Sequence, residues 1–145
     1  MRNRYDLFVQ QYNLKTGDRI VLPKSNLGWI QHHVIYYRDK YNRHMIIENK
    51  DGVGVRIISL EELLKDIKTI TRFERFSGSN QQRIAAMDRA FNKLGTRYDL
   101  ANFNCEHFCN YVQYEKSKSH QIGNVGKGLF AIGAIFFLVA LARKK

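Results

Sequence analysis

The chain has 145 residues, enough for one hydrophobic core and an appendage but not for a second domain of ordinary size. Its 24 Lys and Arg against 13 Asp and Glu give a formal net charge of +11, so an anionic partner is expected, either a nucleic acid or an anionic membrane surface. The two cysteines, Cys105 and Cys109, lie on adjacent turns of one predicted helix, so a disulfide framework is not indicated and a reducing compartment is consistent with their number.

The first half of the sequence predicts an antiparallel sheet. Residues 1–14 are expected to form an N-terminal arm or a short first element, and they open no apolar signal region that would direct the domain to secretion. After a turn at residues 17–18, short apolar runs separated by turn residues indicate strands. Strands are expected at residues 19–22, 31–37, 45–48 and 55–58, with a further one within 68–76. The second and third strands form a hairpin with a polar tip between Arg38 and Arg43.

Three helices are expected after these strands. Ser59-Leu60-Glu61-Glu62 has the Ser-x-x-Glu pattern of a capping box and starts a helix that runs to about Asp66. An amphipathic pattern over residues 80–94, ended by Gly95, predicts the second helix, and the third runs over about residues 105–115. Because strands precede the longer helices, the order indicates an α+β fold, an antiparallel sheet with helices packed on one side.

Cys105 stands where the third helix begins, and this position activates a thiol. Phe108, Tyr111 and Val112 have helical spacing, and Asn104 can cap the helix, so the free backbone N–H groups of the first turn surround the sulfur. These dipoles favour negative charge and lower the pKa of the thiol. Cys105 is therefore a candidate nucleophile.

Two neighbours on the same helix are expected to be structural. Cys109 is expected to pack in the core. His107 lies two residues past the nucleophile, about 200° around the helix, so its ring points away from the sulfur and is expected to make a structural hydrogen bond. For the same reason Cys105, His107 and Cys109 cannot bind one zinc ion without breaking the helix, and no metal site is expected.

The base for this nucleophile is expected on the strand at residues 31–37. That strand carries two adjacent imidazoles, His32 and His33, about 70 residues upstream of Cys105, so they reach the sulfur only through folding. Side chains alternate along a strand, so the two rings lie on opposite faces and one of them points away from Cys105.

These residues resemble those of a known family. Asn-Cys-Glu-His-Phe at residues 104–108 is similar to the nucleophile motif of the lecithin:retinol acyltransferase (LRAT) family, including the H-Ras-like suppressor phospholipase/acyltransferases, in the papain-like superfamily. Further similar landmarks are Gly17-Asp18, Val55-Arg56 before Ser59-Leu60-Glu61-Glu62, and Leu94-Gly95 with Tyr98. The resemblance covers about residues 15–120 and the hydrophobic tail, and implies a papain-like catalytic domain. It also implies that His32, four residues before Tyr36, is the base and that His44 is the third catalytic residue.

The residue that supports His32 depends on the register of the hairpin. One register places His44 opposite His32, on the same face of the sheet. A turn over residues 39–42 instead places Asn49 opposite His32, and a slip of one residue brings Glu48 there. The spacing favours His44, then Asn49, then Glu48.

The C-terminal segment is a candidate membrane anchor. Residues 128–142 are uncharged and mostly apolar, between Lys127 and the cations of residues 143–145. As a helix this run is about 22 Å long, short of the roughly 30 Å hydrocarbon core of a bilayer. Extension back to residue 122, with snorkelling of the flanking cations, brings the length close to a full span. We expect a single-pass anchor at residues 121–145, with the catalytic domain facing the cytoplasm.

The resemblance implies a thiol-dependent lipid acyltransferase or phospholipase A. Cys105 would attack a glycerophospholipid ester and form an acyl-thioester, and an amine, an alcohol or water would accept the acyl group. The expected partners are the phospholipid substrate and the membrane; no nucleic acid, metal or organic cofactor is expected. Two alternatives stand beside it, a cysteine peptidase or amidase on the same fold and a non-catalytic membrane-anchored interaction module.

Overall fold

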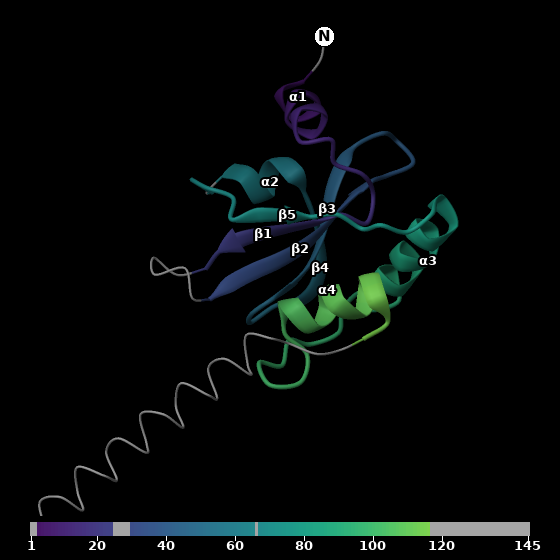
Figure 1. Cartoon of the computed structure of the whole chain (residues 1–145). Coiled ribbons are helices and arrows are strands. Elements are labelled where there is room, and N and C mark those ends of the chain that lie inside the picture. Colours follow the sequence, from purple (N-terminus) through teal and green to yellow (C-terminus); the bar gives the residue numbers. More distant parts are fainter. Residues whose placement is uncertain (1–2, 25–29, 66, 117–145) are drawn as a thin grey trace, which may run out of the picture.

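The computed structural model describes residues 3–24, 30–65 and 67–116, which form one antiparallel sheet and helices around it (Figure 1). The sheet has five strands in the order β4-β3-β2-β1-β5. The strands are β1 (Arg19–Pro23), β2 (Gln31–Arg38), β3 (His44–Lys50), β4 (Gly54–Ser59) and β5 (Arg72–Glu74). The helices are α1 (Arg4–Gln11), α2 (Leu60–Lys65), α3 (Asn80–Phe91) and α4 (Cys105–Tyr114). The α+β class and the predicted strands are confirmed, with boundaries that differ by a few residues.

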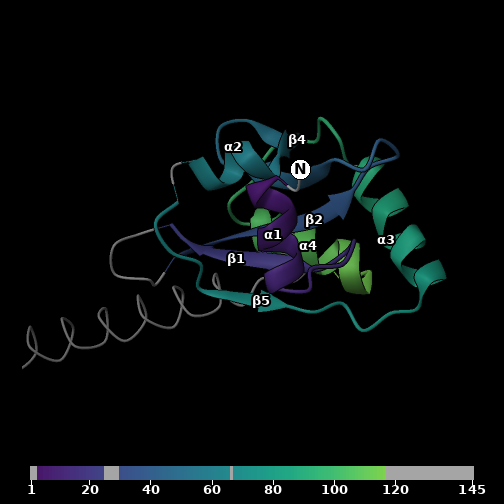
Figure 2. The same ribbon diagram turned by 90° about the horizontal axis from the view of Figure 1, so that it is seen from above.

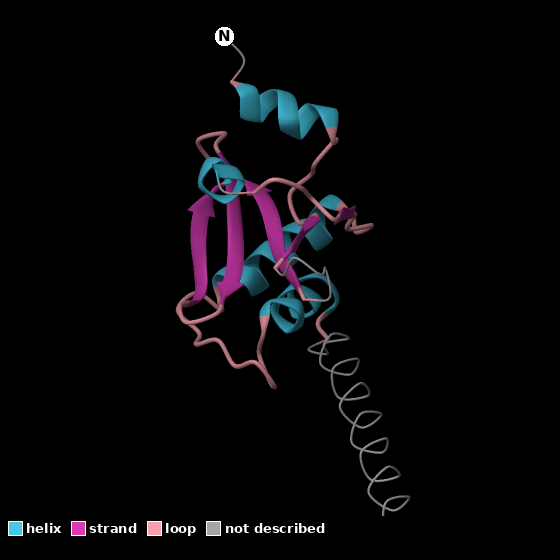
Figure 3. Ribbon diagram, turned by 90° about the vertical axis from the view of Figure 1, so that its left-hand side faces the viewer, coloured by secondary structure: helices cyan, strands magenta, loops and turns pink. Residues whose placement is uncertain are grey.

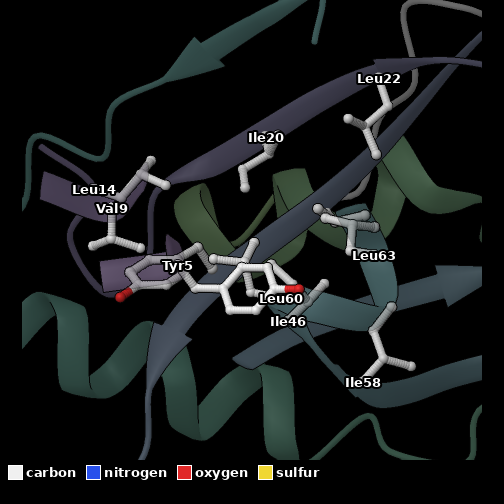
Figure 4. Close-up of a cluster of buried hydrophobic side chains, with 11 residues drawn as sticks. Tyr5, Val9, Leu14, Ile20, Leu22, Ile46, Ile58, Leu60 and Leu63 are labelled. Carbon is white, nitrogen blue, oxygen red and sulfur yellow. The ribbon is translucent and has the colours of Figure 1, made fainter. Parts of the chain in front are cut away.

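Helices cover both faces of the sheet, whereas the sequence predicted helices on one side only (Figures 2 and 3). On one face, Val34 and Tyr36 of β2 belong to an apolar cluster with residues of α1 and α2 (Figure 4). On the other face, Ile35 and Tyr37 belong to a second cluster with residues of α3 and α4. The reason lies in β2 itself: it is buried without a break over residues 33–37, and a strand that is apolar on both faces requires cover on both.

Residues 4–11, within the predicted N-terminal arm, form a helix that completes the first of these clusters. Asn3 caps α1 and Asp6 closes the capping box by accepting the N–H of Asn3. The helix buries Tyr5 and Val9 against the sheet. The arm is therefore part of the domain's packing.

The hairpin of β2 and β3 has a register different from the one that the spacing of the histidines favoured. Arg38 lies opposite His44, and Val34 lies opposite Glu48. Asp39 closes the turn between the strands because its Oδ1 accepts the N–H groups of Tyr41 and Arg43, both at 2.9 Å. This turn sets which side chain of β3 comes near His32.

The predicted anchor at residues 121–145 lies outside the described residues. Within the described part of the chain, no helix has the length and apolar character needed to cross a bilayer.

Candidate active site

Cys105 is the first residue of α4, and its position is fixed by a capping box. The Asn104 side chain accepts the N–H of His107 at 3.0 Å, and the His107 ring accepts the N–H of Asn104 through Nδ1 at 3.2 Å. Cys105 is 4% exposed, so its sulfur lies at a largely buried helix N-terminus, where the helix dipole stabilises a thiolate. The predicted cap and the structural role of His107 are both found.

The sulfur lies beside the beginning of β2, where β3 no longer pairs with that strand. The β2–β3 pairing runs from Arg38–His44 to Val34–Glu48. Beyond it, Cys105 Sγ is 3.6 Å from the carbonyl oxygen of Gln31.

Asn49 fixes the segment that leads into Cys105. Its Nδ2 donates to the carbonyl oxygen of Phe103 at 2.6 Å. Asn49 is fully buried, so this bond ties β3 firmly to the loop before Cys105. The amide that sequence reasoning ranked second as a support for His32 therefore positions the cysteine loop instead.

His32 is hydrogen-bonded to both Cys105 and Glu48. Its Nε2 lies 2.5 Å from Glu48 Oε2, which leaves Nδ1 for the sulfur. Burial alone would lower the pKa of His32, but the hydrogen bonds and negative charges of Cys105 and Glu48 raise it to about 9. The imidazolium form is therefore favoured at neutral pH.

The thiol of Cys105 shows the complementary shift. Burial would raise its pKa, but the hydrogen bond and charge of His32, the backbone N–H of His33 and the charge of Lys24 together lower it. Because the pKa of the thiol is lowered while that of His32 is raised, both shifts favour the pair with its proton on the imidazole rather than on the sulfur. A thiolate beside an imidazolium is the form in which a cysteine can act as a nucleophile.

Glu48 is the third member of this hydrogen-bonded chain, and its side chain is 3% exposed. Burial would raise the pKa of this carboxyl, yet its bonds to His32 and Arg56 lower it. Arg56 lies opposite Glu48 in the β3–β4 pairing and donates from Nε to Glu48 Oε1 at 2.8 Å. Glu48 is thus a buried carboxylate held between two cations, and it orients the His32 ring.

His44, the third residue that the resemblance implied, is not near His32. Its Nε2 is 2.7 Å from Asp6 Oδ1, and its Nδ1 is 2.8 Å from the Tyr36 hydroxyl. His44 lies opposite Arg38, at the far end of β2 from His32, because the turn places the strands in a different register. It connects α1 to the sheet.

Sequence reasoning ranked Glu48 last and missed Arg56. One signal could have found both. Glu48 interrupts the apolar run Met45-Ile46-Ile47, and an acid on a buried strand requires cationic partners. Arg56, on the next predicted strand, is such a partner.

The remaining candidates are structural. His33 is 1% exposed on the opposite face of β2, where its Nδ1 is 3.4 Å from Arg19 Nη1. Burial, aided by the charge of Arg19, lowers the pKa of His33 to about 4, so the ring is neutral. Cys109 is fully buried in the apolar cluster under α4, and burial raises the pKa of its thiol. Among the residues that the structure describes, no group of three or more His, Cys, Asp or Glu could hold a metal ion.

One family model matches residues 6–117 of the chain, and its description is "Permuted papain-like amidase enzyme, YaeF/YiiX, C92 family". The matched range contains Cys105, His32 and Glu48. The order along the chain agrees with a permuted enzyme, because papain-like enzymes in the ordinary order carry the cysteine before the histidine. No curated protein and no solved structure matches the chain. The match supports the papain-like superfamily and favours the amidase alternative over the lipid acyltransferase; it does not show the LRAT family.

Proposed function

The chain belongs to the permuted papain-like amidase family, and on that premise we propose that it is an amidase with Cys105 as nucleophile and His32 as base. One observation carries the proposal. Cys105 begins a helix and is hydrogen-bonded to His32, and His32 is hydrogen-bonded to Glu48. A nucleophile, a base and a group that orients the base are the parts that covalent catalysis needs.

The first half of the cycle forms an acyl-enzyme. The Cys105 thiolate attacks the carbonyl carbon of an amide, and the oxyanion is held by backbone N–H groups that include that of Cys105 itself. His32 gives its proton to the amide nitrogen, the C–N bond breaks, and the amine leaves. Cys105 then holds the acyl group as a thioester, and His32 is neutral.

The second half returns the enzyme to its starting state. Neutral His32 takes a proton from water, whose oxygen attacks the thioester carbonyl. The C–S bond breaks, the carboxylic acid leaves, and the thiolate–imidazolium pair is restored. Glu48 keeps the His32 ring in place and stabilises its charge in both halves, while Arg56 fixes the Glu48 carboxylate.

An active ester of a short acyl group, such as a p-nitrophenyl ester, tests this cycle. We expect intact mass spectrometry to find one added acyl group on the wild type and on Cys109→Ala, and none on Cys105→Ala. Cys109 is the matched control because it is the second cysteine of the same helix but is buried in the core. An adduct that survives in Cys105→Ala would refute the assignment of the nucleophile.

A second candidate is the lipid acyltransferase or phospholipase A that the LRAT-like motif implies. The feature that favours it is the apolar run at residues 128–142 between basic flanks, which would hold the site beside a lipid substrate. Under this proposal the chain is a single-pass C-terminally anchored protein with its catalytic domain in the cytoplasm, and an amine, an alcohol or water accepts the acyl group.

Two measurements separate the candidates. Acyl transfer from detergent-dispersed phosphatidylcholine to Cys105, lost on deletion of residues 122–145, would favour the lipid enzyme. Cleavage of a soluble amide that is unaffected by the deletion would favour the amidase. Slow alkylation of Cys105, with no acyl-enzyme from any substrate, would leave a non-catalytic membrane-anchored interaction module.

A further inference from the structure

A cavity of about 510 Å³ opens beside the catalytic base. His32 and Glu48 line it, and Cys105 is not among the described residues that do. It lies on the α2 face of the sheet, whereas α4 packs on the other face. The volume falls within the range of small-molecule sites.

The wall of this cavity is aliphatic. Leu22 of β1, Ile58 of β4, Leu63 of α2 and Ile67 line it. Figure 4 shows Leu22, Ile58 and Leu63 together at one end of the apolar cluster, away from Tyr5 and Val9. This end of the apolar cluster thus borders a cavity next to His32 that a ligand can enter.

The charged side chains at this cavity largely neutralise one another. Lys24 Nζ is 3.5 Å from Asp51 Oδ2. Arg56 pairs with Glu48 at 2.8 Å and with Glu62 at 3.8 Å. Paired charges at the rim and an aliphatic wall suit an uncharged apolar group better than an ionic one.

The chemistry of the base decides which half of the substrate lies here. During acylation the leaving nitrogen must come within about 3 Å of the His32 ring nitrogen that gives it a proton. The acyl carbon, by contrast, is bonded to the sulfur of Cys105. That ring nitrogen is Nδ1, which faces the sulfur, so the leaving nitrogen itself lies between Cys105 and His32. Only a side chain that extends from the leaving amine past the His32 ring enters the cavity that His32 and Glu48 line.

We infer that this cavity binds the side chain of the leaving amine and selects amines whose side chain is aliphatic. The inference rests on the proposed amidase function. The physical basis of this selection is that one methylene group placed in an apolar pocket changes kcat/KM by about 10- to 200-fold. The preference acts on acylation alone, because the amine has left before the thioester is hydrolysed.

A series of amides that share one acyl group and differ only in the leaving amine tests this inference. We expect kcat/KM for leucinamide as leaving group to exceed that for glycinamide and for lysinamide by at least about tenfold. The p-nitrophenyl ester of the same acyl group forms the same acyl-enzyme through a leaving group that needs no proton from His32. Added leucinamide should also capture this acyl-enzyme better than added glycinamide, because aminolysis is the reverse of acylation.

Ile67→Ser and Ile70→Ser form a matched pair of variants. Both isoleucines are half-buried against the same apolar cluster, but only Ile67 lines this cavity. We expect Ile67→Ser to reduce the preference for leucinamide to about threefold or less, with the rate of hydrolysis of the acyl-enzyme unchanged, and Ile70→Ser to keep the preference. Thermal unfolding checks that both variants fold. If Ile67→Ser does not fold, the capture of the wild-type acyl-enzyme by added leucinamide and glycinamide tests the inference instead.

The outcomes separate this inference from the function on which it rests. Ester hydrolysis through Cys105 without any preference among amines would overturn the leaving-group site and leave the amidase proposal standing. A preference for lysinamide, or one that is equal in Ile67→Ser and wild type, would also overturn it. Failure to form any acyl-enzyme from the ester would refute the proposed function itself.

Discussion

Glu48 bears a negative charge in a position that is almost fully buried, and two cations make this possible. His32 and Arg56 each occupy one carboxylate oxygen, so the cost of removing the charge from water is offset on both sides. The same arrangement lets one carboxylate hold the His32 ring and raise its pKa. Loss of Arg56 would leave Glu48 free to turn away from the base.

Glu48→Gln tests the charge while keeping the size of the side chain. An amide at this position still occupies the site but no longer stabilises the imidazolium, so kcat/KM is expected to fall by about 10²- to 10⁴-fold. The measurement is the hydrolysis of the amides described above, which share one acyl group. Glu62→Gln is the control, because Glu62 is exposed and lies on the other side of Arg56, at 3.8 Å. Equal losses of kcat/KM in the two variants would show that any negative charge near Arg56 has this effect, and would contradict a specific role for Glu48.

The pH dependence of catalysis follows from the two opposite pKa shifts. The lowered pKa of Cys105 means that the thiolate is present above that pKa, so activity rises as the pH increases through it. The raised pKa of His32 means that its proton is present below about 9 and lost above it, so amide cleavage declines as the pH passes about 9. A pH profile of kcat/KM measures both limbs.

Glu48→Gln provides the control for the alkaline limb. It removes a charge that raises the pKa of His32, so this limb should move to lower pH. An alkaline limb that stays in place would contradict the assignment of His32.

Among the elements, the hairpin of β2 and β3 decides which residues meet. Alternating and continuous apolar runs predict the strands, and the Asn104 cap predicts the start of α4. Register is harder to predict because it depends on the length of the turn. The spacing of the histidines does not show that Asp39 closes this turn from its side chain. A sequence can therefore give Cys105 and His32 as partners and still misplace the third residue.

His44→Ala distinguishes the two roles that have been considered for His44. If this residue connects α1 to the sheet, its loss removes the hydrogen bonds to the buried Tyr36 hydroxyl and to Asp6 and lowers the free energy of unfolding by about 1–3 kcal/mol. The value of kcat/KM should change by less than about threefold, because His44 does not contact Cys105, His32 or Glu48. Removal of a catalytic residue causes a far larger loss. Urea denaturation and kcat/KM measure the two effects. If His44→Ala lowers kcat/KM as much as Glu48→Gln does, without a change in the free energy of unfolding, then His44 is a catalytic residue after all.

At the scale of the whole molecule, the domain is a sheet between two layers of helices with Cys105, His32 and Glu48 at one end. The His32–Glu48 pair lies on the α2 face and α4 approaches from the other, so the site exists only where β3 stops pairing with β2. Composition does not predict the position of this site, since the position depends on which face of the sheet each helix covers.

Composition does predict the distribution of charge along the chain. Residues 122–145 hold four cations and no acid, so the chain's +11 less four leaves +7 on residues 1–121.

Vesicle binding tests how charge and the C-terminal segment share the attraction to membranes. We expect the full chain to co-sediment with both neutral and anionic vesicles, because an apolar run binds lipid in either case. Residues 1–121 alone should bind only anionic vesicles, and about 0.5 M salt should release them, since each basic residue near the surface contributes about 1 kcal/mol that salt screens. Circular dichroism checks that the shortened chain is folded. If the two forms bind neutral vesicles equally, residues 122–145 are not the anchor, because their removal would not have changed the binding.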